Sequence, residues 1–251
     1  RETVSGESRV AATPETVKKM IALSHSVSIE AGAGIQASFS DADYKNNGAE
    51  IVSRNLALQS DLLLMVRPLD EKEIITLKPK QFMVGMLEPF NNDLQALLKK
   101  QGVSAFALEA LPRNTRAQSM DVLSSQANIA GYKAVILAAD YYKKFMPMLM
   151  TAAGTVKAAK VIVLGAGVAG LQAVATAKRL GAVVEASDVR PSVQEQIESL
   201  GGKFIEVPFE TEEEKDCAIG KGGYAKPMPK SWLTRQSKVV AEKAKSADII
   251  I

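Results

Sequence analysis

The 251-residue sequence is poor in cysteine and histidine, with one residue of each. Because Cys217 is the only cysteine, an intramolecular disulfide is impossible, which fits a reducing compartment. A metal site is also implausible, since zinc and similar ions need several histidine, cysteine or carboxylate ligands. We therefore expect a protein that holds neither a disulfide nor a metal ion.

The sequence also lacks a dense basic tract and a long apolar run. Its 31 Lys and Arg and 28 Asp and Glu residues leave a net charge of +3, without a cluster that would favour nucleic acid or a membrane surface. The most apolar stretch, residues 161–177, is interrupted by three glycines and Gln172, whereas a transmembrane helix needs about 20 predominantly apolar residues. We expect a chain that is soluble by itself, binds no nucleic acid and does not insert into a membrane.

The sequence does contain an alternation of strand-like and helix-like patterns. At roughly 100–200 residues per domain, its length suggests two domains. Alternating strands and helices are typical of parallel βαβ units, so we predict an α/β protein with two Rossmann-like domains, each with a parallel sheet. The predicted parts are an N-terminal domain over 1–118, a long connecting helix within 119–150, and a Rossmann domain over 151–251. The sequence opens without Met and stops inside an apolar run, so we expect a fragment truncated at its C-terminus.

The predicted elements follow from apolar periodicity and from capping residues. In the first domain, the predicted strands are 27–30, 62–66, 82–87 and 103–108, and the predicted helices begin at Pro14 and at Asn91. The connecting helix is predicted over 119–145. In the second domain, the predicted strands are 161–164, 183–186, 203–207 and 248–251, and the predicted helices are 168–180, 192–200 and 231–245. Residues 208–230 have little periodicity and are predicted to be a long loop.

The most specific pattern is a glycine-rich turn between a strand and a helix, Gly165-Ala166-Gly167-Val168-Ala169-Gly170. The first glycine permits the tight turn, the second lets the backbone approach a pyrophosphate, and the third allows close packing of helix on strand. The free N–H groups and the positive dipole end of the helix then face the phosphates. The pattern therefore predicts a dinucleotide site at this turn.

An acidic residue completes the predicted site. Asp188 ends the next strand, 18 residues after Gly170. A carboxylate there accepts hydrogen bonds from the ribose hydroxyls and repels a 2′-phosphate, which favours NAD over NADP. Arg190 lies two residues further on, and a nearby arginine sometimes accepts that phosphate. The alternative interpretation is a structural glycine-rich turn with a capping aspartate.

A second glycine pattern, residues 32–37, imitates the first but has Ala37 in place of the third glycine. The polar segment 38–47 that follows lacks an amphipathic helix to present N–H groups. We interpret this pattern as a tight loop of the first domain.

An acid–base residue for substrate oxidation is hard to find. Most dehydrogenases that oxidise an alcohol or amine use a histidine or lysine to handle the substrate proton. The single histidine, His25, lies in a Ser-rich turn, where a surface side chain is the better interpretation. Either the base is a lysine or an aspartate, or the chemistry moves no proton. Direct hydride transfer between two nicotinamides is of the second kind and needs proximity, orientation and exclusion of water.

Six segments distributed over essentially the whole chain resemble one known family. They are residues 9–14, 113–126, 130–132, 151–156, 188–191 and 222–226. Together they resemble proton-translocating NAD(P) transhydrogenase, specifically the NAD(H)-binding domain of its alpha subunit, often called domain I.

The resemblance implies that Arg113, Gln118, Asp121 and Ser124 surround the nicotinamide. Gln118 and Ser124 are suited to hydrogen-bond the carboxamide, and Arg113 and Asp121 to pair and shape their loop. A structural alternative is an ion pair that caps the long helix. The resemblance also implies that Tyr224 lies in a flexible loop that closes on bound nucleotide, the alternative being an exposed tyrosine in a glycine-rich linker.

The reaction and the partners are implied in the same way. The cofactor-binding set becomes the glycine turn together with Asp188, Val189, Arg190 and Tyr224. NADH on this chain would give hydride to NADP+ held on a separate NADP(H)-binding domain, in a Re/Si-specific transhydrogenase that couples the exchange to proton passage through a membrane domain. The chain would be a homodimer, peripheral at the cytoplasmic face of the inner (plasma) membrane.

Two other functions remain open. A soluble amino-acid dehydrogenase of the alanine dehydrogenase type shares this architecture, but that family places a substrate-binding lysine and a catalytic histidine where this sequence has Arg67 and Met86. A base such as Lys72 or Lys78 would have to replace them. The third possibility is a non-catalytic NAD-binding regulator.

Overall fold

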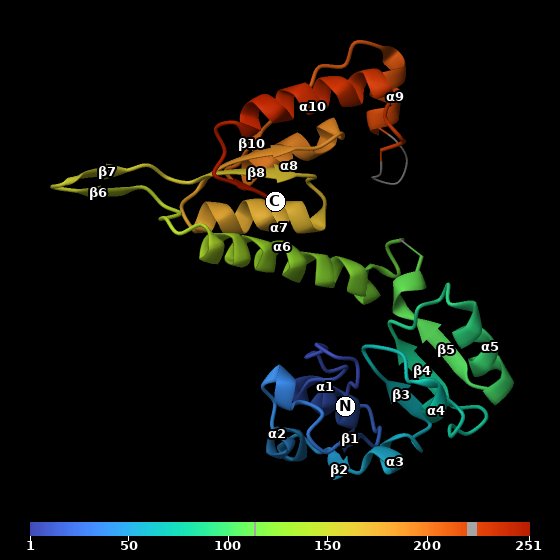
Figure 1. Cartoon of the computed structure of the whole chain (residues 1–251). Coiled ribbons are helices and arrows are strands. Elements are labelled where there is room, and N and C mark those ends of the chain that lie inside the picture. The colour runs from blue at the N-terminus through green and yellow to red at the C-terminus, as the bar shows by residue number, and fades with distance from the viewer. Residues whose placement is uncertain (113, 220–224) are drawn as a thin grey trace. The chain divides into compact units, whose positions relative to one another are not determined.

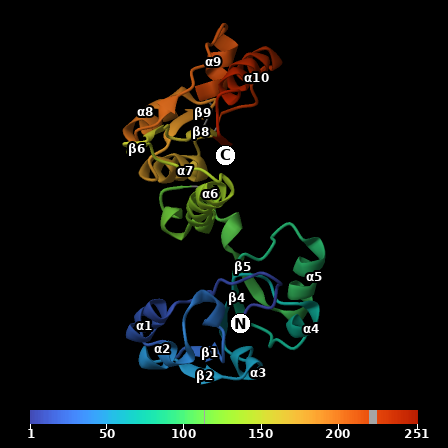
Figure 2. The same cartoon turned by 60° about the vertical axis from the view of Figure 1, so that its left-hand side comes forward.

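The computed structural model describes residues 1–112, 114–219 and 225–251, and the chain divides into two compact units (Figures 1 and 2). The first unit is Arg1–Val122 and the second is Leu123–Ile251. Both contain parallel sheets with helices, so the predicted Rossmann-like α/β class is confirmed.

Parallel strands of the first unit form two sheets. One has three strands in the order β3 (Leu62–Leu64), β4 (Phe82–Gly85), β5 (Ser104–Ala107). The other pairs β1 (Ser28–Glu30) with β2 (Glu50–Val52), and β2 is a strand that the sequence pattern did not indicate. The α-helices of this unit are α1 (Pro14–Ala22), α2 (Asp41–Asn46), α3 (Arg54–Ala57), α4 (Glu71–Ile74) and α5 (Asn92–Gln101).

The starts of the helices in the first unit follow from capping residues. The Thr13 hydroxyl accepts a hydrogen bond from the Thr16 N–H at 3.2 Å, and Pro14 takes the first helical position of α1, as predicted. Asn91 caps α5 in the same way, accepting from the Leu94 N–H at 3.2 Å. The predicted helix starts are therefore confirmed within one residue.

The second unit is built on a four-stranded parallel sheet in the order β10-β9-β8-β11. Its strands are β8 (Lys160–Leu164), β9 (Val183–Ser187), β10 (Lys203–Phe204) and β11 (Ile249–Ile250). The chain enters the sheet at β8, adds β9 and β10 on one side, and then crosses over to add β11 on the other side of β8. This strand order is that of the first strands of a doubly wound nucleotide-binding sheet. All four strands were predicted, although β10 is shorter than expected.

Several α-helices and a 3-10 turn accompany this sheet. They are α6 (Val122–Tyr141), α7 (Val168–Arg179), η4 (Pro191–Val193), α8 (Gln194–Ser199), α9 (Glu212–Ile219) and α10 (Lys230–Ala244). The core lies between the sheet and α7, where strand residues such as Val161 and Val163 are buried together with Ala173 and Val174. The central run of β8, in which Val161, Ile162 and Val163 are all buried, is what a parallel strand covered on both faces requires.

Helix α6 runs alongside α7 (Figures 1 and 2), and one glycine allows this close packing. A Cβ on Gly131 would lie 2.0 Å from the Ala169 carbonyl oxygen of α7. Val135, one turn further along α6, is fully buried in the core of the second unit. The helix is shorter than the predicted 119–145 at both ends: residues 118–120 form a separate 3-10 turn, and α6 ends at Tyr141.

Two features of the second unit were not expected. The segment 208–230, predicted as an irregular loop, contains α9, so that prediction was wrong. Tertiary contacts of Glu214 and Ala218, both buried, hold α9 in place. An antiparallel hairpin, β6 (Leu149–Thr151) with β7 (Gly154–Val156), follows α6 and projects from the body of the unit (Figure 1).

Among the described residues, no helix combines the length and apolar character that crossing a membrane requires.

Candidate nucleotide-binding site

The predicted glycine turn joins the middle strand β8 to α7. The Gly165 N–H donates to the Ser187 carbonyl at the end of β9, at 2.8 Å, and Gly165 has a φ of +98°, which L side chains rarely adopt. A Cβ on Gly170 would lie 1.7 Å from the Gly165 carbonyl oxygen. These two glycines are therefore required by the backbone itself, in the roles that the sequence predicted for them.

Gly167 differs from the other two glycines. Its φ of −75° is open to any residue, and a Cβ there would meet no atom of the described residues within 4 Å. Gly167 is the N-cap of α7 and provides no side-chain cap for the first N–H groups of this 12-residue helix. The start of α7 is thus a backbone surface, open above Gly167, where N–H groups and the helix dipole favour an anion.

Asp188 lies beside this turn, as predicted. Its Oδ2 atom accepts from the Ala166 N–H at 2.7 Å, which ties the end of β9 to the turn after β8. Arg190 folds back onto the same carboxylate: Oδ1 accepts from the Arg190 N–H at 2.8 Å and from Nε at 2.9 Å, and Oδ2 accepts from Nη2 at 3.0 Å. Asp188 and Arg190 therefore form a two-point ion pair at the edge of the turn.

The charge state of Asp188 follows from these contacts. Burial by itself raises the pKa of the carboxyl, but the hydrogen bonds from the Arg190 side chain, the Arg190 N–H and the Ala166 N–H outweigh it. The pKa of Asp188 therefore lies below its ordinary value, and the same pairing raises that of Arg190. Both groups are charged at neutral pH.

The other predicted site residues are distributed over both units. Gln118 is exposed at the start of the 3-10 turn Gln118–Met120, and Asp121 follows it half-buried in the first unit. Ser124 is half-buried in the first turn of α6, in the second unit. In the second unit, Val189 is half-buried between the two charged residues of the pair. Arg113 and Tyr224 lie outside the described residues, so the arrangement of these side chains around a nicotinamide stays a prediction.

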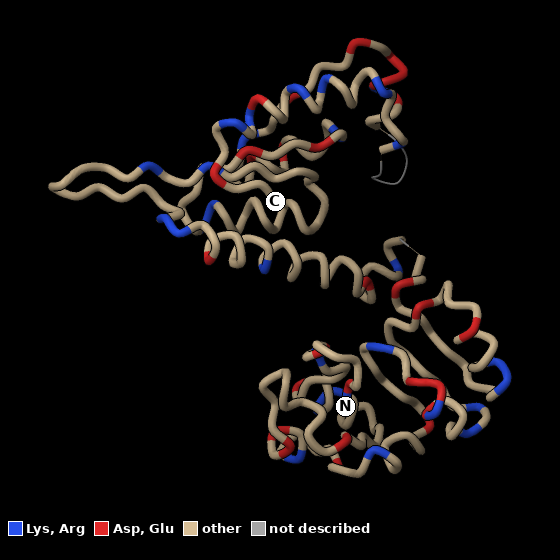
Figure 3. The backbone as a smooth tube through the Cα atoms, in the orientation of Figure 1, with Lys and Arg blue, Asp and Glu red and all other residues tan. Residues whose placement is uncertain are grey.

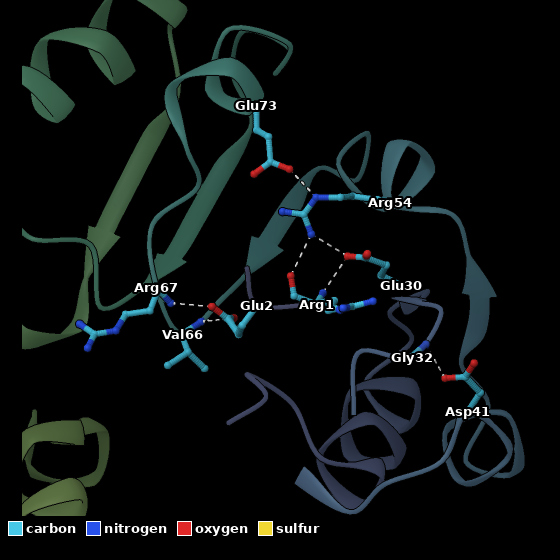
Figure 4. Close-up of polar contacts among 9 residues, drawn as sticks. All are labelled: Arg1, Glu2, Glu30, Gly32, Asp41, Arg54, Val66, Arg67 and Glu73. Carbon is cyan, nitrogen blue, oxygen red and sulfur yellow. Dashed lines mark hydrogen bonds and ion pairs between the residues drawn. The ribbon is translucent and has the colours of Figure 1, made fainter. Parts of the chain in front are cut away.

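A charged cluster in the first unit surrounds Arg67, in the segment that follows β3. Glu7 pairs with Arg9 at 2.6 Å and with Arg67 at 3.4 Å, and the Arg9 hydrogen bonds and charge lower the Glu7 pKa to about 2. The Glu2 carboxylate accepts from the Val66 and Arg67 N–H groups at 2.8 and 3.0 Å (Figure 4). Sequence reasoning did not single out these two glutamates; their only signal was acidic residues in the segment before Arg9.

Met86, the other position that the sequence analysis contrasted with alanine dehydrogenases, follows the neighbouring strand β4. Its N–H donates to the Val66 carbonyl at 3.3 Å, so Met86 and Arg67 occupy adjacent strand ends. The structure therefore brings together the two positions at which the resemblance implies a lysine and a histidine in alanine dehydrogenases, with an ion-paired arginine and a methionine in them. The lysines considered as substitute bases, Lys72 and Lys78, are both exposed.

The second glycine pattern forms a tight loop, as predicted, but the segment 38–47, which we expected to lack a helix, contains α2, whose first turn is capped by the Ser40 side chain. A Cβ on Gly34 would lie 2.6 Å from the ring of buried Tyr44 and 2.9 Å from the Phe39 carbonyl oxygen. The Asp41 carboxylate accepts from the Gly32 N–H at 2.9 Å (Figure 4). The loop is packed against its own neighbours and closes on itself.

Comparison with known proteins agrees with this architecture. Models of the alanine dehydrogenase/PNT N-terminal and C-terminal domains match residues 1–130 and 134–251. An NAD(P) transhydrogenase alpha-subunit protein of Rhodospirillum rubrum is 45% identical over 260 residues, covering all of this chain and 67% of that protein. NAD(P) transhydrogenase subunit alpha of Haemophilus influenzae is 43% identical over 253 residues, and the chain spans 48% of that protein.

Solved structures give the same result. A transhydrogenase from Sinorhizobium meliloti matches with a TM-score of 0.87 at 43% identity, over 100% of this chain and 67% of that one. An L-alanine dehydrogenase matches with a TM-score of 0.74 at 25% identity, over 94% of this chain and 69% of that one.

The chain therefore belongs to the alanine dehydrogenase/PNT family. Within this family it is of the transhydrogenase alpha-subunit type, as the sequence predicted. Identity to the transhydrogenases extends over the whole chain, whereas the 35% identity to alanine dehydrogenase 1 of Staphylococcus aureus covers 56% of it.

Proposed function

We propose that this chain binds NAD(H) at the glycine turn and serves as the NAD(H)-binding component of a proton-translocating transhydrogenase. The observation that carries the proposal is the turn itself. Two glycines are enforced by the backbone, a third leaves open space above the start of α7, and a charged aspartate stands at the end of the next strand. Sequence identity to transhydrogenase alpha subunits along the whole chain supports the same function.

The residues of the turn would hold the dinucleotide by its phosphates and its adenosine ribose. The first N–H groups of α7 would donate to the pyrophosphate, which approaches across Gly167. Asp188 would accept from the ribose hydroxyls. Gln118 and Ser124 would orient the carboxamide, Arg113 and Asp121 would shape their loop, and Tyr224 would cover the bound nucleotide.

The nicotinamide of NADH, when bound, supplies a hydride that passes to the nicotinamide of NADP+ on a partner domain. This exchange needs no protein base, which agrees with the residues at the two positions where alanine dehydrogenases carry their substrate lysine and their base. Arg67 is paired with Glu7, and an arginine does not deprotonate in proteins. Met86 has no proton to transfer. The protein's contribution is to orient the nicotinamide and exclude water.

The complete enzyme requires parts beyond this chain. We propose that it docks onto an NADP(H)-binding domain and a membrane domain through which protons pass, and that it stands peripherally at the cytoplasmic face of the membrane. A homodimer is supported by the β6–β7 hairpin, whose six strand residues are all exposed on the second unit.

The proposal is tested by mixing the purified chain with NADH, an NADP(H)-binding partner domain and a thio- or acetylpyridine analogue of NADP+. Hydride transfer to the analogue is followed by its absorbance. We expect turnover that requires both proteins and that falls by about tenfold or more in Gln118→Ala, because the carboxamide loses an orienting hydrogen bond. Gln95→Ala, an exposed glutamine on α5, is the matched control and should keep the wild-type rate.

The other functions predict different results in the same assay. NADH binding without transfer to any partner would identify a regulator. Reduction of NAD+ by an amino acid, with no second protein present, would identify an amino-acid dehydrogenase and overturn the proposal.

A further inference from the structure

The Arg190 guanidinium occupies the Asp188 oxygens that the ribose hydroxyls of a bound nucleotide would use. A carboxylate offers about four acceptor positions. In Asp188 these receive the Arg190 N–H, Nε and Nη2 and the Ala166 N–H, at 2.7 to 3.0 Å. The Asp188 side chain is 7% exposed and the Arg190 side chain 21% exposed. Ribose hydroxyls therefore reach the carboxylate oxygens only when the guanidinium leaves them.

The same pairing changes the charge at the edge of the turn. A lone Asp188 would present a full negative charge and repel a 2′-phosphate. With the guanidinium in contact, the pair is neutral, and the repulsion that excludes NADP is weakened. The guanidinium, once released, also has the planar donor array that binds phosphate at two points.

We propose that Arg190 determines the cofactor preference of this turn: Asp188 holds a guanidinium that a 2′-phosphate would otherwise bind. Asp188 thus favours NAD(H) in two ways, by accepting the ribose hydroxyls and by occupying a neighbouring group suited to bind the phosphate of NADP(H). Arg190 opposes this preference, because it occupies the carboxylate oxygens that the ribose needs and weakens the repulsion of a 2′-phosphate. This inference rests on the proposed function, because it needs a nucleotide at the turn.

The proposal predicts opposite effects for two neighbouring substitutions. Asp188→Asn removes the carboxylate and releases the guanidinium, so NADPH affinity should rise by about tenfold or more while NADH affinity falls. Arg190→Gln frees the Asp188 oxygens for the ribose and restores the repulsion, so the preference for NADH over NADPH should increase. If Arg190 were only a structural clamp, Arg190→Gln would weaken both nucleotides equally.

The decisive variant is the double substitution Asp188→Asn/Arg190→Gln. We expect it to lose the NADPH affinity that Asp188→Asn gains, because the phosphate ligand is gone. Asp188→Asn/Arg190→Lys should keep part of the gain, since lysine retains the charge without the planar fork. A double variant that binds NADPH as tightly as Asp188→Asn would overturn the proposal.

The experiment measures dissociation constants for NADH and NADPH on the whole chain by nucleotide fluorescence, with thermal unfolding to confirm that each variant is folded. Should Asp188→Asn fail to fold, Arg190→Gln against wild type still tests the sign of the change in preference. Arg179→Gln, exposed in the last turn of α7, removes the same charge far from the turn and should leave the preference unchanged.

The two proposals fail differently. If wild type binds no NADH, the proposed function fails. If wild type binds NADH but the NADH-to-NADPH preference does not respond to Arg190, the function stands and only this inference fails.

Discussion

The three glycines of the turn serve different physical purposes, although the motif presents them as equivalent. Gly165 is needed for a left-handed φ, and Gly170 for the approach of α7 to the strand end. Gly167 satisfies neither condition, because its φ is ordinary and the space around its missing Cβ is open. A glycine that folding does not require points to a ligand that approaches the backbone there.

This difference separates stability from binding. In Gly167→Ala we expect an unchanged or slightly higher thermal midpoint, since the new methyl meets nothing and the unfolded chain loses freedom. NADH affinity should fall by about tenfold or more, because the methyl stands where the pyrophosphate approaches. In Gly170→Ala the methyl meets the Gly165 carbonyl, so the chain should lose about 1–3 kcal/mol of stability along with binding. Thermal unfolding and NADH titration of both variants check this; equal destabilisation would contradict it.

The part of the site that could be predicted from sequence is the part set by backbone geometry. The spacing of Gly165, Gly167 and Gly170 after an apolar strand fixes the turn, and Asp188 follows from the next strand end. The bond from Arg190 to Asp188 could not be predicted in the same way. Two charged residues separated by one position in a loop can turn toward each other or apart, and only the local backbone decides between them.

The helices α9 and α10 show how a buried charge can fix an element that lacks a periodic pattern. Glu214 of α9 is 1% exposed, and its carboxylate accepts from the Glu210 N–H at 2.8 Å and from the Ser231 hydroxyl at 2.9 Å. It also pairs with Arg235 of α10. The predicted irregular segment becomes helical because α9 is held by these contacts to α10 and not by an apolar face. Basic residues recur along α10, and acidic residues gather in the segment that leads into α9 (Figure 3).

These contacts make stability depend on pH. The Glu210 N–H bond, followed by the Arg235 and Ser231 side chains, outweighs burial and lowers the Glu214 pKa from 4.5 to about 2. Because the folded pKa is depressed, the unfolded chain takes up the proton first as pH falls. The contribution of Glu214 is therefore complete above pH 4.5 and is lost as the pH falls from 4.5 to about 2.

We expect Glu214→Gln to lower the thermal midpoint at pH 7, because Arg235 is left without a charged partner on α9. The difference between wild type and variant should shrink over the same acidic range. Thermal unfolding between pH 7 and pH 2.5 measures it. Glu212→Gln, in the same helix but 84% exposed, is the control and should follow wild type at every pH. A Glu214→Gln difference that stays constant with pH would refute this assignment.

The β6–β7 hairpin of the second unit exposes apolar side chains that do not pack into the core of that unit. Residues 148–156 contain no charged side chain, and the hairpin they form appears without Lys, Arg, Asp or Glu at its tip (Figure 3). Met150 is 70% exposed, and Met148, Leu149 and Val156 are exposed as well. A two-stranded hairpin by itself is at best marginally stable in water, so packing against another surface would have to stabilise it. Sequence periodicity could not indicate this arm, since its strands are short and have no buried face of their own.

The proposed homodimer supplies such a surface, because a second copy brings an identical apolar arm and an isologous interface needs only self-complementarity. We expect wild type to sediment as a dimer at micromolar concentration. Met150→Asp should weaken the dimer by about tenfold or more, since a carboxylate without a partner would be buried in the interface, while the exposed position leaves the fold of each subunit intact. Leu23→Asp, which places the same charge on an equally exposed apolar position of the first unit, should remain dimeric. Sedimentation velocity of the three proteins separates the cases. A monomeric wild type would remove the homodimer from the proposal. A dimeric Met150→Asp protein would show that the interface lies away from the hairpin. In either case the proposal of NADH binding at the turn would stand.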